Sequence, residues 1–254
     1  MNIEKGLERG VLYIVATPIG NNDDMSSRAR EILIACDRVA AEDTRRAARL
    51  LAGLGGNQHK LISLHEHNED KLVDYLVGEL VKGASVALVS DSGTPLLSDP
   101  GYRLVKAASS SGISVRPIPG PSSIIAALSV CPLPAHPFCF VGFLPKKKRE
   151  LHSRLQELIK KTEAVVFFES PRRIRRTLSL LSTLTERKIF LIKEMTKTFE
   201  DSWSGSASEL LFQLDQDPKG EFVGVLEKVE LSENITLDAE VFLKELLKHL
   251  PPAK

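Results

Sequence analysis

Residues 90–101 read Ser90-Asp91-Ser92-Gly93-Thr94-Pro95-Leu96-Leu97-Ser98-Asp99-Pro100-Gly101, and they directly follow the apolar run Val86-Ala87-Leu88-Val89. A short apolar run bounded by turn residues is typical of a strand that is buried on both faces. The prolines, glycines and aspartates that follow it predict a loop of fixed shape with polar walls. A purely structural turn needs only about four such residues, so a ligand-binding loop is the favoured interpretation. In open α/β sheets, ligands bind at the carboxyl ends of the strands, which is where this loop is expected.

Strand-like and helix-like segments alternate along the first half of the chain. The pattern predicts strands over residues 11–16, 38–42, 61–65, 85–90 and 113–118. Helices are expected over residues 26–36 and 44–54, around Leu72, Leu76 and Leu80, from about residue 101, and after residue 123. Strands that are separated by helices favour a largely parallel sheet covered on both faces.

A proline-rich tract separates the two halves of the chain. Cys131-Pro132-Leu133-Pro134-Ala135-His136-Pro137 cannot continue a helix and is the best candidate for a linker. Beyond it, strands are expected over residues 138–143, 164–169, 188–194 and 222–229, with helices over 147–161 and after Ser170-Pro171. We therefore expect an N-terminal αβ domain over residues 1–131, a linker over 132–137, a second αβ domain over 138–231 and a shortened C-terminal helical tail over 232–254.

The composition is that of an ordinary globular protein. The 254 residues are 43% hydrophobic and 26% charged, and the formal net charge is +1, so no global basic field attracts nucleic acid. Cys36, Cys131 and Cys139 share no metal-type spacing and are expected to be reduced core residues. No apolar run has the length of a membrane span and the N-terminus has no apolar signal core, which predicts a cytoplasmic protein. The absence of GxGxxG, Walker A, GxSxG and HExxH motifs removes the usual support for dinucleotide binding, P-loop phosphoryl transfer, and hydrolase and zincin chemistry.

Two further loops are expected at the same edge of the first sheet. Residues 16–24 follow the first strand and are rich in proline, glycine and Asx residues, and residues 119–123 follow the last strand. Capping of the next helix is the alternative role of the 16–24 loop. Because parallel strands end at one edge, a pocket shared with the loop at Asp91 is the favoured interpretation. Ser122 or Ser123 would cap the following helix and leave backbone N–H groups for a polar ligand.

Three charged clusters each have a structural and a functional interpretation. In Glu42-Asp43-Thr44-Arg45-Arg46, capping of a helix by Asp43 or Thr44 explains most of the pattern, and a catalytic role is the alternative. His65-Glu66-His67 would place two imidazoles on one face of a strand, but no metal is expected because no further ligand has a suitable spacing. Lys146-Lys147-Lys148-Arg149 and the arginines at 172, 173, 175 and 176 are either solvated helix faces or a track for a phosphate backbone.

Short motifs along nearly the whole chain carry a resemblance to a known family. They occupy residues 12–21, 41–45, 88–95, 99–102, 119–121, 142–145, 167–170, 194–198 and 220–223. In this order they resemble the tetrapyrrole methylase superfamily, and within it the branch that methylates ribosomal RNA of the small subunit. The resemblance implies an α/β fold with two αβα domains of the tetrapyrrole methylase type, a mostly parallel sheet in the N-terminal domain and a mixed sheet in the C-terminal domain.

The resemblance also implies a function. It implies that S-adenosylmethionine binds between the domains and that a homodimer methylates the ribose 2′-hydroxyl of a cytidine in 16S rRNA of the small ribosomal subunit. The matching cofactor positions are Pro18, Gly20, Asp91, Ser92, Gly93, Thr94, Pro95, Ser122 and Ser123 in the first domain, and Glu169 and Met195 in the second. The sequence departs from the family pattern at Asn22, where an apolar residue is usual.

Methyl transfer from a sulfonium needs neither a metal nor a covalent nucleophile, in keeping with a chain that has neither signature. In-line placement of the acceptor can contribute about 7–11 kcal/mol, whereas a general base contributes about 10²–10⁴-fold, so positioning should dominate. Candidate catalytic residues are Glu42, Asp43 and Glu194 as a base, with Arg45 and Lys197 orienting phosphate or acid. RNA contacts are expected from Lys146, Lys147, Lys148, Arg149, Arg172 and Arg173. The alternatives are a methylase of a small tetrapyrrole-like substrate and a noncatalytic nucleotide-binding regulator.

Overall fold

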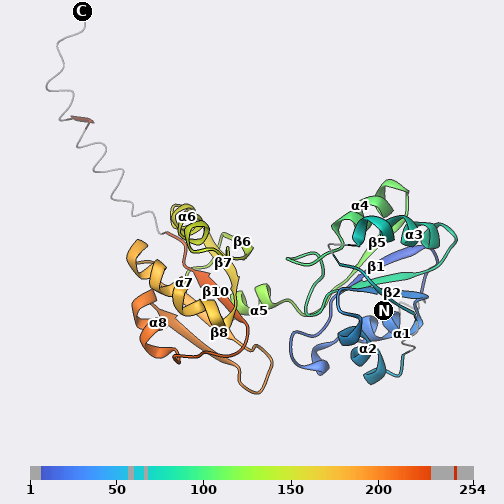
Figure 1. Ribbon diagram of the computed structural model, residues 1–254, viewed down its shortest axis with the longest axis horizontal. Helices are drawn as coiled ribbons and strands as arrows, with labels where there is room; N and C mark the ends of the chain where they lie inside the picture. Colours follow the sequence, from blue (N-terminus) through green and yellow to red (C-terminus); the bar gives the residue numbers. More distant parts are fainter. Residues whose placement is uncertain (1–6, 57–59, 66–67, 230–242, 245–254) are drawn as a thin grey trace, which may run out of the picture.

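The chain folds into two five-stranded sheets, each with its own helices (Figure 1). The computed structural model describes residues 7–56, 60–65, 68–229 and 243–244. Within these ranges, no helix is long and apolar enough to cross a membrane. The predicted C-terminal tail lies outside the described residues except for Leu243 and Lys244.

The first sheet is entirely parallel and has the strand order β3-β2-β4-β1-β5. Its strands are β1 (Val11–Val15), β2 (Arg38–Ala41), β3 (Leu61–Ser63), β4 (Val86–Val89) and β5 (Ser114–Ile118). The helices between them are α1 (Ser27–Ala35), α2 (Thr44–Gly53), α3 (Glu69–Val81) and α4 (Tyr102–Ser110), with a short 3₁₀ helix η1 (Asn22–Asp24) before α1. The prediction of a parallel sheet is therefore confirmed for the first half.

Helices cover both faces of this sheet. Leu33 of α1 and Leu51 of α2 pack against one face, and Leu76 of α3 and Leu104 of α4 pack against the other. All four residues of β4, at the centre of the sheet, are buried. A parallel strand that is covered on both faces needs such a continuous apolar run, which is why the sequence marks it so clearly.

The second sheet is mixed and has the order β6-β7-β10-β8-β9. Its strands are β6 (Phe138–Phe143), β7 (Ala164–Glu169), β8 (Ile189–Lys193), β9 (Asp201–Gly205) and β10 (Phe222–Leu226). Its helices are α5 (Ser123–Ser129), α6 (Lys148–Leu158), α7 (Pro171–Leu184) and α8 (Ala207–Gln213). Only the β6–β7 pair is parallel, and the other neighbours run antiparallel.

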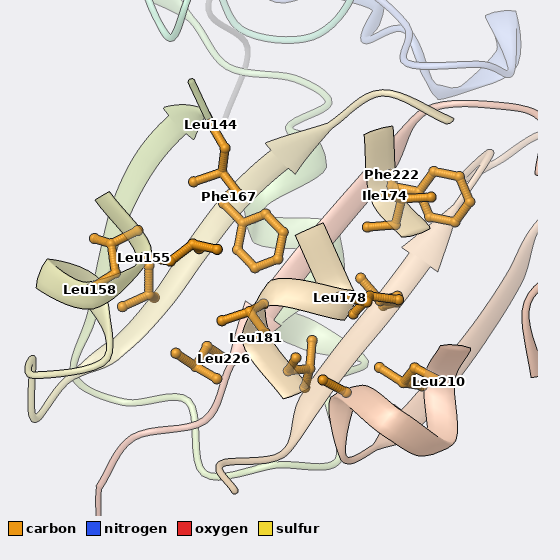
Figure 2. Close-up of a cluster of buried hydrophobic side chains, with 14 of the residues drawn as sticks. Leu144, Leu155, Leu158, Phe167, Ile174, Leu178, Leu181, Leu210, Phe222 and Leu226 are labelled. Carbon is orange, nitrogen blue, oxygen red and sulfur yellow. The ribbon is translucent and has the colours of Figure 1, made fainter. Parts of the chain in front are cut away.

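The core of this half lies between the sheet and the helices α6, α7 and α8. Leu155 and Leu158 of α6 and Leu178 and Leu181 of α7 gather around Phe167 of β7 (Figure 2). The Phe167 ring extends over the neighbouring strand β10, where a Cβ atom at Gly224 would lie 2.2 Å from its Cζ. A glycine is therefore required at the middle of β10 for this ring to lie flat on the sheet.

Two elements of this half were not predicted from the sequence, namely β9 and α8. Strand β9 reads Asp-Ser-Trp-Ser-Gly and pairs only with β8, so it lies at the edge of the sheet and lacks an apolar alternation. Helix α8 has seven residues and begins with a capping box between Ser206 and Glu209. That capping box is visible in the sequence as Ser-x-x-Glu before an apolar pair, a recognised signal for a helix start.

The chain passes between the two sheets earlier than the proline tract suggested. Helix α5 packs through Ile124 and Ala127 on the second sheet, and the tract that follows it packs there through Leu133 and Ala135. The carbonyl of Pro134 also accepts a hydrogen bond from Lys228 N–H at 2.9 Å. We therefore propose a domain boundary at residues 119–122 instead of 132–137.

Candidate active site

A cavity of about 390 Å³ lies between the carboxyl edge of the first sheet and the second sheet. From the first half it is lined by Glu42, Arg46 and parts of the loop that follows β4. From the second half it is lined by the N-terminal end of α5, the ends of β6 and β7, the segment after β8 and the start of β10. Its size falls within the range of cavities that hold small-molecule ligands, about 300–1,000 Å³.

Most residues predicted to bind a cofactor line this cavity. They are Asp91, Ser92, Gly93, Thr94, Ser122, Ser123, Glu169 and Met195. Pro18 and Gly20 line a neighbouring cavity of about 470 Å³, which shares Arg46 and Asp91 with the first. Pro95 is buried and lines neither cavity. The expected convergence of strand-end loops thus brings together most of the predicted residues.

Backbone hydrogen bonds tie these strand-end loops together. Thr17 and Gly93 form an isolated antiparallel bridge, with N–H to carbonyl distances of 2.9 and 3.1 Å. Gly93 has a φ of +81°, a conformation that a glycine adopts without strain. The Thr94 hydroxyl donates to the carbonyl of Pro121 at 3.1 Å, which links the loop after β4 to the one after β5. The first-half wall of the cavity is therefore a connected unit.

The two halves also meet beside the cavity, at the loop after β1. Asn21 N–H donates to the Thr196 hydroxyl at 3.0 Å. A Cβ atom at Gly20 would lie 2.6 Å from Thr196 Oγ1 and from Lys197 Cγ, so only a glycine permits this approach. Residues 20 and 21 thus hold the loop that carries Met195 against the first half.

Four residues without the freedom of glycine have a positive φ in these loops. They are Leu96 at 75°, Ser98 at 74°, Glu194 at 50° and Thr196 at 66°. Such conformations cost of order 1–3 kcal/mol each and persist only where the surrounding structure enforces them. Their concentration in the segments around the cavity supports a functional role for this region.

The carboxyl groups of the first half differ in their surroundings. Asp91 accepts a hydrogen bond from Asp43 N–H at 3.1 Å and lies 3.6 Å from Arg46 Nε. Burial and the neighbouring carboxylates of Glu42 and Asp91 raise the pKa of Asp99 to about 6, against a hydrogen bond with Ser90. Asp99 lines the cavity. It was not among the predicted site residues, although it belongs to the polar loop over residues 90–101.

Glu194 is oriented by the loop that carries it. Its carboxylate accepts hydrogen bonds from Lys197 Nζ at 2.9 Å and from Glu221 N–H at 3.1 Å. Burial acts to raise the pKa of Glu194, but these hydrogen bonds outweigh it and the pKa is lowered. Glu194 is therefore held as a carboxylate at the wall of the cavity.

Glu169 is buried and its carboxylate is directed toward α7. It accepts hydrogen bonds from Ser170 N–H at 2.7 Å and the Thr177 hydroxyl at 2.8 Å, and it pairs with Arg173 at 2.5 Å. Arg173 also donates to the carbonyl of Leu144 at 3.0 Å. The buried pair explains why Arg173, predicted to contact RNA, is directed into the protein.

Asp43 and Arg45 do not line the cavity of about 390 Å³, although Asp43 lines the neighbouring one. Asp43 caps α2 by accepting from Arg45 N–H at 2.9 Å, and its carboxylate pairs with the exposed Arg45 guanidinium at 2.8 Å. Hydrogen bonds from the Arg45 side chain and backbone hold the pKa of Asp43 well below its usual range. The structural interpretation of this part of the charged cluster therefore accounts for both residues, whereas Glu42 and Arg46 line the cavity.

A model of the family described as Tetrapyrrole (Corrin/Porphyrin) Methylases matches residues 11–211. The chain belongs to the tetrapyrrole methylase family. This match covers the loops after β1, β4 and β5 and most of the second sheet.

Relatives of this tetrapyrrole methylase carry a common name. Ribosomal RNA small subunit methyltransferase I of Xylella fastidiosa (strain Temecula1 / ATCC 700964) is 43% identical over 250 residues, which cover 96% of this chain and 91% of the relative. The protein of that name from Vibrio cholerae serotype O1 is 44% identical over 218 residues, 84% of this chain and 75% of the relative. Among solved structures, diphthine synthase has a TM-score of 0.66 over 91% of this chain and 95% of its own, at 14% identity, and shows the fold alone. The chain is thus a methyltransferase that belongs with the ribosomal RNA small subunit methyltransferase I proteins.

The cavity of the methylase is lined by more acidic than basic side chains. Of the described residues, the acidic ones are Glu42, Asp91, Asp99, Glu169, Glu194 and Glu221, and the basic ones are Arg46 and Lys197. Even with Glu169 paired to Arg173 outside the cavity, this surplus of carboxylates is complementary to a positively charged ligand.

The basic residues predicted to contact RNA divide into two groups. Lys146, Lys147, Lys148, Arg149 and Arg172 are exposed. Arg176 donates to the carbonyl of Lys146 at 2.9 Å, and with Arg173 it attaches this basic segment to α7.

In the His65-Glu66-His67 segment, Glu66 and His67 lie outside the described residues. The described residues contain no group of three or more His, Cys, Asp or Glu side chains that could hold a metal ion.

Several cavity residues were not predicted from the sequence. Phe143 and Phe168 line the cavity of the methylase from the second half, as do Glu221, Phe222 and Val223. The aromatic residues lie within strands and give no loop signal, so strand-end reasoning alone does not find them. The register of β6 against β7, which the pattern does not reveal, places Phe143 in the cavity wall.

Proposed function

We propose that this methyltransferase transfers a methyl group from S-adenosylmethionine to the ribose 2′-hydroxyl of a cytidine in 16S rRNA of the small ribosomal subunit. The names of the relatives support ribosomal RNA as the substrate. The cavity shared by the two sheets carries the proposal, because it combines polar loops with acidic walls at the carboxyl edge of a parallel sheet. We further propose that the chain acts as a homodimer in the cytoplasm.

The donor site that we propose lies among the loops after β4 and β5 and the segment after β8. The donor supplies an activated methyl group on a sulfonium, a cation that also carries an ammonium group. Asp91 and Asp99 on one wall and Glu194 on the other provide the complementary charge. Ser122 and the N-terminal end of α5 offer hydroxyl and backbone groups to the polar end of such a ligand.

The main contribution of the chain to the reaction is positioning. The bridge between Thr17 and Gly93 and the contact of Asn21 with Thr196 fix both walls of the cavity before a substrate arrives. A preorganised pair of reactants gains about 7–11 kcal/mol relative to reactants that must collide. The apolar side chains of Ile124 and Phe168 exclude water from the same space.

Asp99 is suited to receive the proton that the acceptor hydroxyl loses. It lies in the cavity wall, and its pKa of about 6 makes it a stronger base than an ordinary aspartate while it is still ionised at neutral pH. Glu42 is the neighbouring carboxylate, and the repulsion between the two groups favours proton uptake by one of them. We propose Asp99 in place of the three bases expected from the sequence, of which Asp43 caps α2 and Glu42 and Glu194 line the same cavity.

A tetrapyrrole-like substrate is the alternative that the family description raises. Such substrates carry several carboxylates, and the acidic residues Glu42, Asp99 and Glu221 of the cavity would repel them. Exposed Lys147 and Arg149 instead provide a basic surface outside the cavity, where a phosphate backbone can lie. These observations favour RNA.

The experiment that tests the proposal supplies the protein with a donor that carries a labelled methyl group. Small ribosomal subunits, deproteinised 16S rRNA and a porphyrinogen are offered separately, and nucleosides are identified by mass spectrometry. We expect label in 2′-O-methylcytidine from the subunit or its RNA. Label that is confined to the porphyrinogen, or found on a base and not a ribose, would overturn the assignment.

A single variant tests the donor site. Asp91→Ala should weaken donor binding by about tenfold or more, because a hydrogen bond to a charged group contributes about 1.5–3 kcal/mol. Calorimetry with S-adenosylhomocysteine and S-adenosylmethionine measures the effect. Asp217→Ala, an exposed position outside the cavity, is the matched control and should bind like the unmodified protein.

A further inference from the structure

Strand β6 contains an irregularity just before its end. Phe140 pairs with Val166 of β7, but the next pair along the strands is Phe143 with Phe168. Three steps on β6 therefore oppose two steps on β7, which is the definition of a bulge. Gly142, within this bulge, has a φ of +68°, which few residues other than glycine adopt readily.

The bulge reverses the direction of the residues that follow it. Cys139 and Val141 face the core beneath α6 and α7, and regular alternation would direct Phe143 to the same side. Instead Leu144 occupies that core with an exposure of 3%, and Phe143 lines the cavity with an exposure of 58%. The local structure therefore places a phenylalanine in the cavity wall instead of in the core.

Neighbouring rings fix the orientation of Phe143. Its ring meets that of Phe168 edge-to-face, with centroids 5.3 Å apart and planes at 61°, and Phe168 meets Phe140 in the same way at 4.9 Å. An edge-to-face contact occupies only part of a ring, so the rest of Phe143 is open to a ligand. A phenylalanine that is rigid and more than half exposed in a cavity wall is a stacking surface.

A basic segment begins three residues after Phe143 and is fixed relative to it. Arg173 donates to the carbonyl of Leu144 at 3.0 Å, and Arg176 donates to the carbonyl of Lys146 at 2.9 Å. Lys146 and the three basic residues after it are exposed. Proteins that bind single-stranded nucleic acid combine an aromatic surface for bases with basic side chains for the backbone in this way.

We propose that Phe143 is the surface on which the base of the methylated nucleotide stacks, while Lys146 and Lys147 contact the adjoining phosphates. The inference rests on the proposed function and assigns its acceptor site. RNA is read in single-stranded regions, where an unstacked base is available to an aromatic side chain. Asp99 lines the same cavity as Phe143, so a base held on Phe143 has its ribose in the space that Asp99 borders.

The test compares Phe143→Ala and Phe143→Trp with the unmodified protein. Binding of a single-stranded RNA oligonucleotide is measured by fluorescence anisotropy, transfer to small subunits by kcat/KM, and binding of S-adenosylhomocysteine by calorimetry. Phe143→Ala should weaken RNA binding about 5- to 150-fold, the equivalent of about 1–3 kcal/mol for one stacked base. Phe143→Trp should retain RNA binding, and neither variant should change the affinity for S-adenosylhomocysteine.

Phe212→Ala is the matched control, because Phe212 is 93% exposed on α8 and does not line the cavity. It should behave as the unmodified protein, and melting temperatures verify that all variants fold. RNA affinity of Phe143→Ala within twofold of the unmodified protein would overturn the inference. A loss of S-adenosylhomocysteine affinity with RNA affinity retained would also overturn it, since Phe143 would then stack on the donor's adenine.

The outcome for the unmodified protein separates this inference from the proposed function. A protein that binds RNA through Phe143 but transfers no methyl group to a ribose would overturn the proposed function alone. A protein that methylates the ribose equally well with Phe143→Ala would overturn the stacking role alone. Absence of any RNA binding by the unmodified protein would overturn both.

Discussion

Replacing Asp99 by asparagine should stabilise the protein in a way that depends on pH. The pKa of Asp99 is raised from 3.8 to about 6 in the folded state, chiefly by burial and by the carboxylates of Glu42 and Asp91. Between these two values the folded state binds more protons at this site than the unfolded state, so stability falls as the pH rises. Above the folded pKa, the full penalty for ionising Asp99 is present.

The magnitude follows from the two pKa values. A difference of about two corresponds to about 3 kcal/mol, because each tenfold change in proton affinity is about 1.4 kcal/mol. Asp99 is partly exposed, and screening by solvent reduces this to about 1–2 kcal/mol. Asp99→Asn preserves the shape of the side chain and its acceptor for Ser90 but cannot ionise, so it should recover this amount at neutral pH.

The assay is thermal unfolding of both proteins between pH 4.5 and pH 8. The advantage of Asp99→Asn should grow up to about pH 6 and remain constant above about pH 7, where it should raise the melting temperature by about 2–8 °C. Asp217→Asn, at an exposed position, is the control and should show no such trend. The variant should at the same time lose activity by about 10²-fold or more if Asp99 receives the proton.

The result that would refute this reasoning is an advantage that is as large at pH 4.5 as at pH 7.5. A variant that is less stable than the unmodified protein at neutral pH would refute it as well. Either outcome would mean that Asp99 is not held beside other carboxylates in a poorly solvated wall.

Three further variants test contacts in and around the cavity. Gly20→Ala should lower kcat/KM by about 10²-fold with little change in melting temperature, because the added Cβ separates the two walls, and steady-state kinetics measures this. Combining Lys147→Ala with Arg149→Ala should reduce the slope of log affinity for RNA against log salt concentration by about two, as measured by anisotropy titrations. Arg173→Ala should destabilise the protein by about 3–5 kcal/mol in chemical unfolding, because it leaves the buried Glu169 carboxylate unpaired.

Each substitution has a matched control in the same chain. Gly53→Ala adds a Cβ on α2 where nothing lies within 4 Å, and equal losses in both glycine variants would contradict the separation of the walls. Lys71→Ala removes an exposed charge on α3, and an equal change in salt slope would assign the effect to net charge alone. Arg172→Ala removes the exposed neighbour of Arg173, and a comparable destabilisation would argue against the buried ion pair.

The parallel first sheet could be predicted from the sequence because its signals are local. The apolar run of β4, buried in all four residues and followed at once by a polar loop, predicts both the strand and the loop that lines the cavity. The edge strand β9 could not be predicted, since a strand with one neighbour and polar residues shows no alternation. The boundary that we propose at residues 119–122 differs from the predicted linker, because Pro132 and Pro134 indicate only that this segment is not helical and do not indicate which sheet it packs on.

The candidate site could be predicted only in part, for similar reasons. Asp91 and Ser122 follow strands of one parallel sheet, so their proximity follows from topology. Phe143 could not be predicted as a cavity residue. The bulge that directs its side chain into the cavity depends on how β6 pairs with β7, and the composition of β6 does not show this pairing. Arg173 appears in the sequence as part of a basic run, and only the fold shows that its partner is the buried Glu169.

The left-handed residues around the cavity have a consequence for how this enzyme would respond to selection. Leu96, Ser98, Glu194 and Thr196 each keep a conformation in which glycine would relax the backbone. Selection for thermal stability alone, without selection for activity, should accumulate glycine at these positions. Such substitutions should change the shape of the cavity that holds the reactants. Durability and catalysis therefore compete at these four positions.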